Sequence, residues 1–117
     1  MKLLIFVLNN NEKVDSLLSE LSDQGLRGAT ILHSAGMAQS LYNRHESKLM
    51  NSLKALLDEE HNENTTIFTV VNQEQEQLFY RVVKQVVGEL TEPNTGIIFT
   101  IPVDSVQGLV KKGDSER

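Results

Sequence analysis

The sequence contains no cysteine and no tryptophan, and only two of its 117 residues are proline. Without cysteine the chain has no disulfides, no thiolate metal ligands and no cysteine nucleophile. Long apolar runs are also missing: the longest, residues 3–8, is far too short to cross a bilayer as a helix. One lysine precedes that run and no small-residue cleavage site follows it, so we expect no signal peptide. These absences predict a cytoplasmic protein without membrane insertion.

Basic charge is scarce as well. The chain carries 11 Lys and Arg against 16 Asp and Glu, which gives a formal net charge of −5. Nonspecific affinity for nucleic acid comes from Lys and Arg that neutralise phosphates, and anionic membranes attract basic clusters. We therefore expect no nucleic-acid partner. The length fits one small domain, whose modest core would benefit from oligomerisation.

Strand patterns and helix patterns alternate along the chain. Continuous apolar or β-branched runs indicate strands, and apolar residues at i, i+3, i+4 and i+7 indicate helices. The expected order is a strand at 3–8, a helix from Val14 to Leu21, a strand at 28–34, an insert at 37–64, a strand at 65–71, a helix stripe from Leu78 to Leu90 and a strand at 96–101. This βαββαβ order predicts an α+β, ferredoxin-like fold with an antiparallel sheet.

Local signals set the ends of these elements. We expect Gly25 to follow the first helix as its C-cap, and Asn72 with Gln75 to form a capping box on the second. Pro102 is expected to interrupt the last strand. A short final element is predicted from Val103 to Leu109, before a mobile tail at 111–117.

The insert at 37–64 is too long for a plain loop. Its apolar residues fall on one helical face and predict a helix at about 46–60: Leu49, Met50, Leu53, Leu56 and Leu57. The first, third and fourth strands hardly alternate, so the sheet face away from the two helices also needs a cover. Another subunit in a closed cyclic assembly or the insert helix could supply it, and the sequence leaves both open.

Candidate catalytic and metal-binding patterns are weak. Acids at the helix starts (Glu12, Asp15, Glu74 and Glu76) are explained by solvation. The Asp58–His61 segment could hold a divalent ion only if its helix unwound, and we favour a solvated helix end. His33 is expected to be a packed or interface side chain. No P-loop or GxGxxG pattern occurs, so we predict no enzyme activity, cofactor or metal site.

Three local features together resemble the PII signal-transduction family. They are GLRGAT at residues 25–30, the long insert at the position of that family's T-loop, and GIIFTIPVD at residues 96–104. The likeness covers residues 1–110 as a single PII-like domain, apart from the insert itself. It implies a non-enzymatic protein that takes part in nitrogen regulation. It also implies a homotrimer with inward-facing sheets, whose T-loop contacts a transporter or a metabolic enzyme.

The resemblance also implies a small ligand, often an adenine nucleotide, in a cleft between subunits. The cleft would be formed by the start of the insert and the 91–97 turn. The residues implied as ligand contacts, several of them through their backbone, are Thr30, Gly36, Met37, Ala38, Gln39, Gly96 and Ile97, with Lys111 and Lys112 as anion contacts from the tail.

The chain departs from the family pattern at its phosphate contacts. Ile97 stands where the family has a lysine, and the family's arginine pair falls near Gly108 and Val110. Loss of such charge-assisted contacts weakens triphosphate binding. The resemblance therefore implies a less charged or cyclic nucleotide, or none. Tyr42 lies where a T-loop can carry a modified tyrosine, but a single tyrosine does not predict modification.

Three other assignments fit the same topology. A CutA-like trimer would bind divalent metals tightly. A structural oligomer would bind no ligand at all. An amino-acid-binding module of the ACT kind is usually attached to a larger enzyme, whereas this whole chain reads as one domain.

Overall fold

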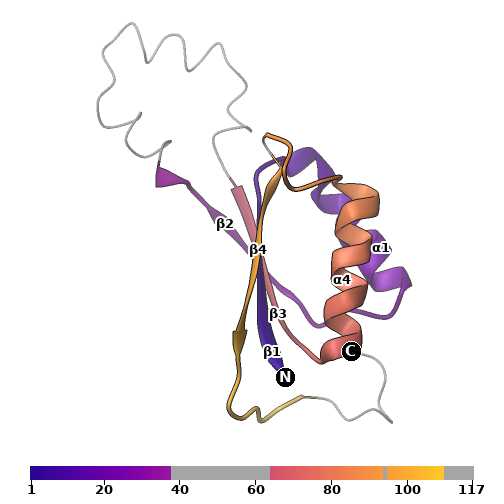
Figure 1. The fold of residues 1–117 in the computed structure, drawn as a ribbon, viewed down its shortest axis with the longest axis vertical. Helices are drawn as coiled ribbons and strands as arrows, with labels where there is room; N and C mark the ends of the chain where they lie inside the picture. Colours follow the sequence, from indigo (N-terminus) through magenta and orange to yellow (C-terminus); the bar gives the residue numbers. More distant parts are fainter. Residues whose placement is uncertain (38–63, 94, 110–117) are drawn as a thin grey trace, which may run out of the picture.

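The structure is a computed structural model that describes residues 1–37, 64–93 and 95–109 (Figure 1). Its elements are β1 (Lys2–Leu8), the 3₁₀ helix η1 (Asn11–Lys13), α1 (Val14–Asp23), β2 (Thr30–Ser34), β3 (Asn64–Val71), α4 (Gln73–Val86) and β4 (Gly96–Pro102). The strands pair antiparallel in the spatial order β2-β3-β1-β4. The predicted ferredoxin-like fold is confirmed. The expected helix at 46–60, Tyr42 and the tail at 111–117 lie outside the described residues.

The core lies between the sheet and the two helices, which cover the same face of it (Figure 1). Every second residue of β1 and β3 points into this layer, as the period of two along a strand requires. The fully or almost fully buried apolar side chains are Leu4, Phe6, Leu8, Leu17, Leu21, Ile67, Val71, Phe79, Val82 and Val83. The rings of Phe6 and Phe79 meet edge to face, with centroids 6.0 Å apart.

The end of α1 confirms the predicted glycine C-cap. Gly25 has φ 97°, its N–H donates to the Ser22 carbonyl at 3.0 Å, and the Leu26 N–H donates to the Leu21 carbonyl at 2.9 Å. This hydrogen-bond pair is a Schellman motif. The Thr69 hydroxyl then donates to the Gly28 carbonyl at 2.9 Å. The strand predicted at 28–34 begins only at Thr30.

The start of α4 is set by a local signal, whereas its end differs from the prediction. The Asn72 side chain accepts from the Gln75 N–H at 2.8 Å, and the Gln75 side chain accepts from the Asn72 N–H at 2.9 Å, which confirms the capping box. The helix ends at Val86, so the predicted stripe reached too far when it included Leu90. Phe79 was missing from that stripe, although it is fully buried.

Two expectations for the C-terminal part are wrong. Pro102 does not interrupt β4 but is its last residue, opposite Lys2. A proline is tolerated there because β4 is an edge strand, with β1 on one side only. The described residues 103–109 contain no helix or strand, although a final element was predicted. Gly108 has φ 92°, and the Val103 N–H donates to the Met1 carbonyl at 3.2 Å, which ties this stretch to the start of the chain.

Candidate functional site

The sheet face away from the helices exposes large apolar side chains, and we call it the open face. Residues on β4 alternate between the two sides: Ile98 packs against the core, whereas Ile97, Phe99 and Ile101 point to the open face and are 58%, 43% and 45% exposed. On β2, Leu32 is 51% exposed. Exposed apolar surface of this extent usually marks an interaction site.

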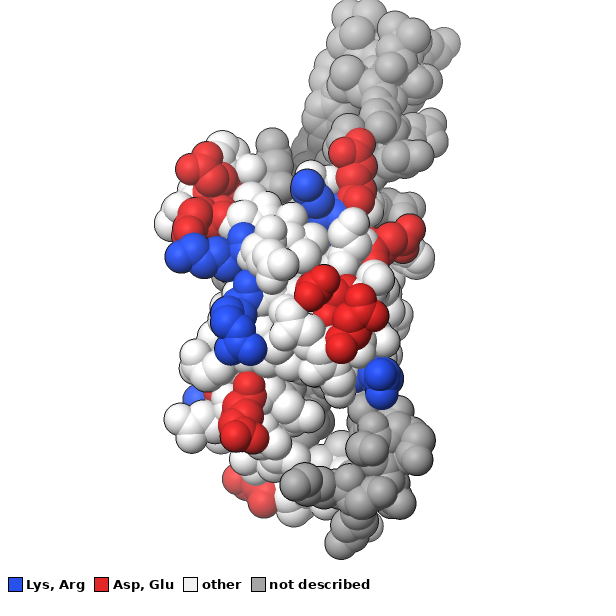
Figure 2. Space-filling model, turned by 90° about the vertical axis from the view of Figure 1, so that its right-hand side faces the viewer, with Lys and Arg blue, Asp and Glu red and all other residues white. Residues whose placement is uncertain are grey.

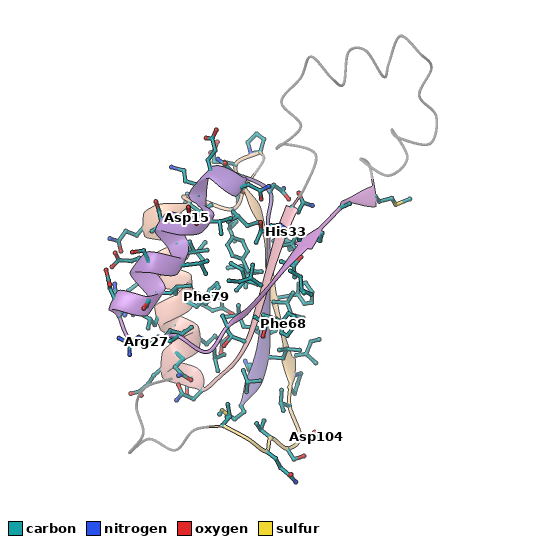
Figure 3. The ribbon with its side chains drawn as sticks, turned by 180° about the vertical axis from the view of Figure 1, so that it is seen from behind. Asp15, Arg27, His33, Phe68, Phe79 and Asp104 are labelled. Carbon is teal, nitrogen blue, oxygen red and sulfur yellow. The ribbon has the colours of Figure 1, made fainter. Side chains whose placement is uncertain are left out.

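The opposite, helix-covered side of the molecule differs in character. Figure 2 shows acidic and basic side chains scattered over this side, with uncharged surface between them. In Figure 3, Phe79 lies between the helices and the sheet, where it belongs to the core. The two sides therefore suit different surroundings: water for the helices, and an apolar partner for the open face.

The residues expected to bind a ligand lie at opposite edges of the sheet. Gly36 and Met37 follow β2 at one edge, and Gly96 and Ile97 begin β4 at the other. The register places the end of β2 and the start of β4 at the same end of the sheet, with β3 and β1 between them. Thr30 lies at the far end of β2, opposite Phe68.

One subunit therefore does not bring the five described candidates together. The remaining candidates (Ala38, Gln39, Lys111 and Lys112) lie outside the described residues. Met37 and Ile97 are 77% and 58% exposed and apolar, and none of the five described candidates is charged. These five positions offer a ligand backbone groups, one hydroxyl and apolar surface, but no cation for a phosphate.

Gly96 is the most constrained of these positions. Its φ is +153°, and a Cβ added there would lie 2.3 Å from the Val7 carbonyl oxygen and 2.8 Å from Phe6 Cε1. The turn before it is also held in place, because the Thr95 carbonyl accepts from the Asn9 N–H at 2.9 Å. The Thr95 hydroxyl donates to the Glu92 carbonyl at 2.8 Å. The chain thus enters β4 in a fixed conformation that only glycine fits.

Among the described residues, His33 is not part of a metal site. His33 was expected to be either a packed side chain or an interface side chain. It is exposed on β2, so it is not packed within the subunit. Within residues 1–37, 64–93 and 95–109, no three His, Asp or Glu side chains come together in a way that could hold a metal ion. Asp58–His61 lie outside these ranges.

The prediction that Glu76 is simply solvated is wrong. Its side chain is nearly buried: Glu76 Oε1 lies 3.6 Å from Lys2 Nζ, and Glu76 Oε2 accepts a 2.6 Å hydrogen bond from the Tyr80 hydroxyl. Burial first, and then the hydrogen bond and charge of Glu76, raise the pKa of Tyr80 to about 12. The spacing of Glu76, Phe79, Tyr80 and Val83 at i, i+3, i+4 and i+7 is the signal that places them on one helix face.

The arrangement of strands and helices identifies the structural class of the protein. A β2-β3-β1-β4 antiparallel sheet with two helices on one face, an apolar open face and a long insert after β2 is a ferredoxin-like α+β domain. Within the described part of the chain, none of the helices has the length and apolar character that a membrane span requires.

The chain belongs to the nitrogen regulatory protein P-II family. The family model with that description matches residues 1–112 and so includes the insert. A search of curated proteins gave no match. Proteins of this family are regulatory signalling proteins that typically form trimers and bind small effectors. The family resemblance inferred from GLRGAT, the insert and GIIFTIPVD is confirmed.

Proposed function

We propose that this protein is a cytoplasmic, non-enzymatic regulator that works as a homotrimer, with residues 1–110 as one domain. A small effector binds between neighbouring subunits and changes the arrangement of the 37–64 segment, which contacts a target protein. A membrane transporter or a metabolic enzyme is the class of target that the family membership favours.

The observation that supports a trimer is the exposure of large apolar side chains on the open face. Leu32, Ile97, Phe99 and Ile101 are all more than 40% exposed in the isolated chain. Each apolar side chain moved from water into a protein interface gains about 1.5–3 kcal/mol when fully buried. A closed cyclic assembly in which three open faces meet removes this surface from water and leaves the charged helices outside.

The edge positions of the candidate residues support a cleft between subunits. In a cyclic trimer each contact joins two different surfaces, so the β2 side of one copy faces the β4 side of the next. Thr30 of one copy then approaches Gly96 and Ile97 of its neighbour, which β3 and β1 keep apart within a single chain. The cleft exists only in the assembly, as expected for a regulator whose subunits respond together.

The chemistry of this cleft favours a ligand of low charge. The described candidates present the hydroxyl of Thr30, the backbone of Gly36 and Gly96, and the apolar side chains of Met37 and Ile97. An adenine-type base gains from apolar contact and from backbone hydrogen bonds. A triphosphate needs cations, which these five residues do not supply. We therefore place cyclic nucleotides and nucleoside monophosphates ahead of ATP.

The trimer is tested by adding one charge to the open face. Phe99→Glu places a carboxylate among the apolar side chains, and light scattering should then give the mass of a monomer instead of a trimer. Gln85→Glu is the matched control, because Gln85 is exposed on the helix side and the same charge there should leave the trimer intact. A monomeric parent protein would contradict the proposal directly.

The effector is tested by thermal shift with adenine and guanine nucleotides, cyclic mono- and dinucleotides and 2-oxoglutarate. A ligand at about 100 times its Kd stabilises the folded state by roughly 2.7 kcal/mol, which moves the melting temperature by several degrees. If one compound raises the melting temperature of the parent protein but not that of Phe99→Glu, the result supports binding between subunits. A trimer that responds to none of these compounds is the structural oligomer without a ligand.

A further inference from the structure

A groove of about 300 Å³ lies on the helix side of the sheet, where the last turn of α4 meets β4. Figure 1 shows the end of α4 and the start of β4 at the same end of the molecule, joined by the turn between them. Apolar side chains from all three segments line the groove: Val83 from α4, Leu90 from the turn and Ile98 from β4. Its volume is at the lower end of the range of small-ligand pockets, about 300–1,000 Å³.

This groove is on the opposite side of the sheet from the proposed cleft between subunits. Ile98 lines the groove, whereas its neighbour Ile97, a candidate cleft residue, lies on the open face. None of the five described cleft candidates lines the groove. Thr91, which begins the 91–97 turn, is the one described residue that both sites include. The groove is therefore a separate site, whose described walls come from a single chain.

The side chains in the groove present hydrocarbon to a ligand. Val83 is only 2% exposed, and Leu90 and Ile98 pack against the core. Tyr80 also lines the groove, but its hydroxyl donates to the Glu76 carboxylate at 2.6 Å. Tyr80 thus offers its ring to the groove while its polar atom is already bound. A ligand needs an apolar body to fill this space.

The backbone around the groove is held by hydrogen bonds. The Val83 carbonyl accepts from the N–H groups of Val87 and Gly88 at 2.7 and 3.0 Å, and Gly88 has φ 110°. The Leu90 carbonyl accepts from the Thr95 hydroxyl at 3.2 Å. These contacts fix both the end of α4 and the turn that follows it. A ligand therefore meets a largely formed surface, which lowers the entropic cost of binding.

Two side chains of opposite charge border the groove. Lys84 Nζ lies 3.3 Å from Glu89 Oε2, and the two side chains are 73% and 60% exposed. An ion pair that is so open to water contributes little to stability. A charged group on a ligand can therefore take the place of either partner.

The end of α4 determines which partner a ligand replaces. The last carbonyls of a helix have no partner within it, and the aligned peptide dipoles give this end a partial negative charge. A ligand ammonium group that takes the place of Lys84 beside Glu89 keeps the favourable interaction with the helix end. A ligand carboxylate that takes the place of Glu89 is repelled by it. The groove therefore favours a cation over an anion.

We propose that this groove binds a small primary amine with an apolar body, of the arylalkylamine class. Its ammonium group pairs with the Glu89 carboxylate at the end of α4, and its apolar body lies against Val83, Leu90 and Ile98. The proposal does not rest on the proposed function, because it involves neither association of subunits nor the cleft between them.

The experiment is an NMR titration of the full-length protein, with the methyl signals of Val83, Leu90 and Ile98 as reporters. Three probes share one apolar body and differ in charge: phenethylamine is a cation, phenethyl alcohol is neutral and hydrocinnamate is an anion. We expect phenethylamine to bind about two- to fivefold more tightly than the alcohol, the range of an exposed ion pair. Hydrocinnamate should bind more weakly than the alcohol, because the helix end repels it.

Two variants assign the charges separately. Glu89→Gln should reduce the preference for phenethylamine over the alcohol to less than about twofold, because the ion pair is lost. Lys84→Gln should strengthen phenethylamine binding by about two- to fivefold and leave the alcohol unaffected, because it removes a competing cation. Both side chains are exposed, so both variants should fold. Glu74→Gln is the matched control: Glu74 is an exposed acid in the first turn of α4 that does not line the groove, and its loss should leave binding unchanged.

Four results would overturn the proposal. One is the absence of methyl shifts with phenethylamine at millimolar concentration. Another is equal affinity for the three probes, which would indicate apolar contact alone. A third is a preference for phenethylamine that survives in Glu89→Gln, which would place the ammonium group elsewhere. The fourth is shifts confined to Ile97 and Ile101, which would place the probe on the open face.

Discussion

Replacing Gly96 with alanine tests whether the entry into β4 is as constrained as the structure indicates. Two costs add at this position. A φ of +153° is a conformation that residues with a side chain rarely adopt, and such strain costs about 1–3 kcal/mol. The added Cβ would also lie 2.3 Å from the Val7 carbonyl oxygen, and overpacking against backbone costs about another 1–3 kcal/mol. We expect Gly96→Ala to lose about 2–6 kcal/mol of unfolding free energy.

Two other glycines separate these costs. Gly88 has φ +110° but no atom within 4 Å of an added Cβ, so Gly88→Ala should lose only the strain, about 1–3 kcal/mol. Gly36 lies outside the left-handed region, and its Cβ would meet Asn64 Nδ2 at an ordinary 3.4 Å. Gly36→Ala should therefore change stability by less than about 1 kcal/mol.

The assay is urea unfolding followed by circular dichroism, with all proteins at the same concentration because association changes apparent stability. For a chain of this length, each kcal/mol corresponds to a change in melting temperature of about 3–6 °C. The predicted order of stability is Gly36→Ala, then Gly88→Ala, then Gly96→Ala as the least stable. If Gly96→Ala is as stable as Gly88→Ala, the close approach to Val7 does not constrain the strand and the reasoning fails.

Three further predictions concern α4. Phe79→Ala should lose about 3–5 kcal/mol, measured by urea unfolding, because it empties the centre of the core next to Phe6. Asn72→Ala should lose about 1 kcal/mol in the same assay, because it opens the capping box. The raised pKa of Tyr80, about 12, means that the folded state holds this proton more tightly than the unfolded chain, whose tyrosine titrates near 10. Stability from this group should be complete below pH 10 and fall as the pH rises toward 12, and Tyr80→Phe should remove that fall.

The periodic elements could be predicted because their signals are local. The strands at 3–8, 65–71 and 96–101 and the capping box at Asn72 each need only a few neighbouring residues to be recognised. The phase of α4 could not be fixed in this way. Leu78 and Phe79 are adjacent and both apolar, and only the position of the helix on the sheet decides that Phe79 is buried. The ion-pair partner of the nearly buried Glu76 is Lys2, which is more than seventy residues away in sequence.

The candidate site was less predictable than the fold for a related reason. The resemblance to the family identified residues at both edges of the sheet, but a sequence does not say that β3 and β1 separate them. Pro102 was wrongly expected to interrupt the last strand. Its effect depends on whether the strand lies at an edge of the sheet, which the local sequence does not show.

Ile97 and Ile98 test whether side chains of β4 are buried by their own chain or by a neighbouring copy. They are neighbours of identical chemistry on opposite sides of the sheet: Ile98 packs against the core of its own chain, and Ile97 is 58% exposed on the open face. Ile98→Ala should lose about 2 kcal/mol, near the lower end of the range for isoleucine because its burial is partial. That loss should not depend on protein concentration.

Ile97→Ala should behave differently if neighbouring copies cover the open face. A contact between chains stabilises folding only to the extent that the chains associate, so its loss depends on protein concentration. We expect Ile97→Ala to lower the melting temperature at high concentration and to have little effect once dilution separates the subunits. Equal effects at all concentrations would mean that Ile97 is covered by its own chain. The cover would then be the insert at 37–64, the alternative that the sequence left open, and the β4 edge could not form a wall of a cleft between subunits.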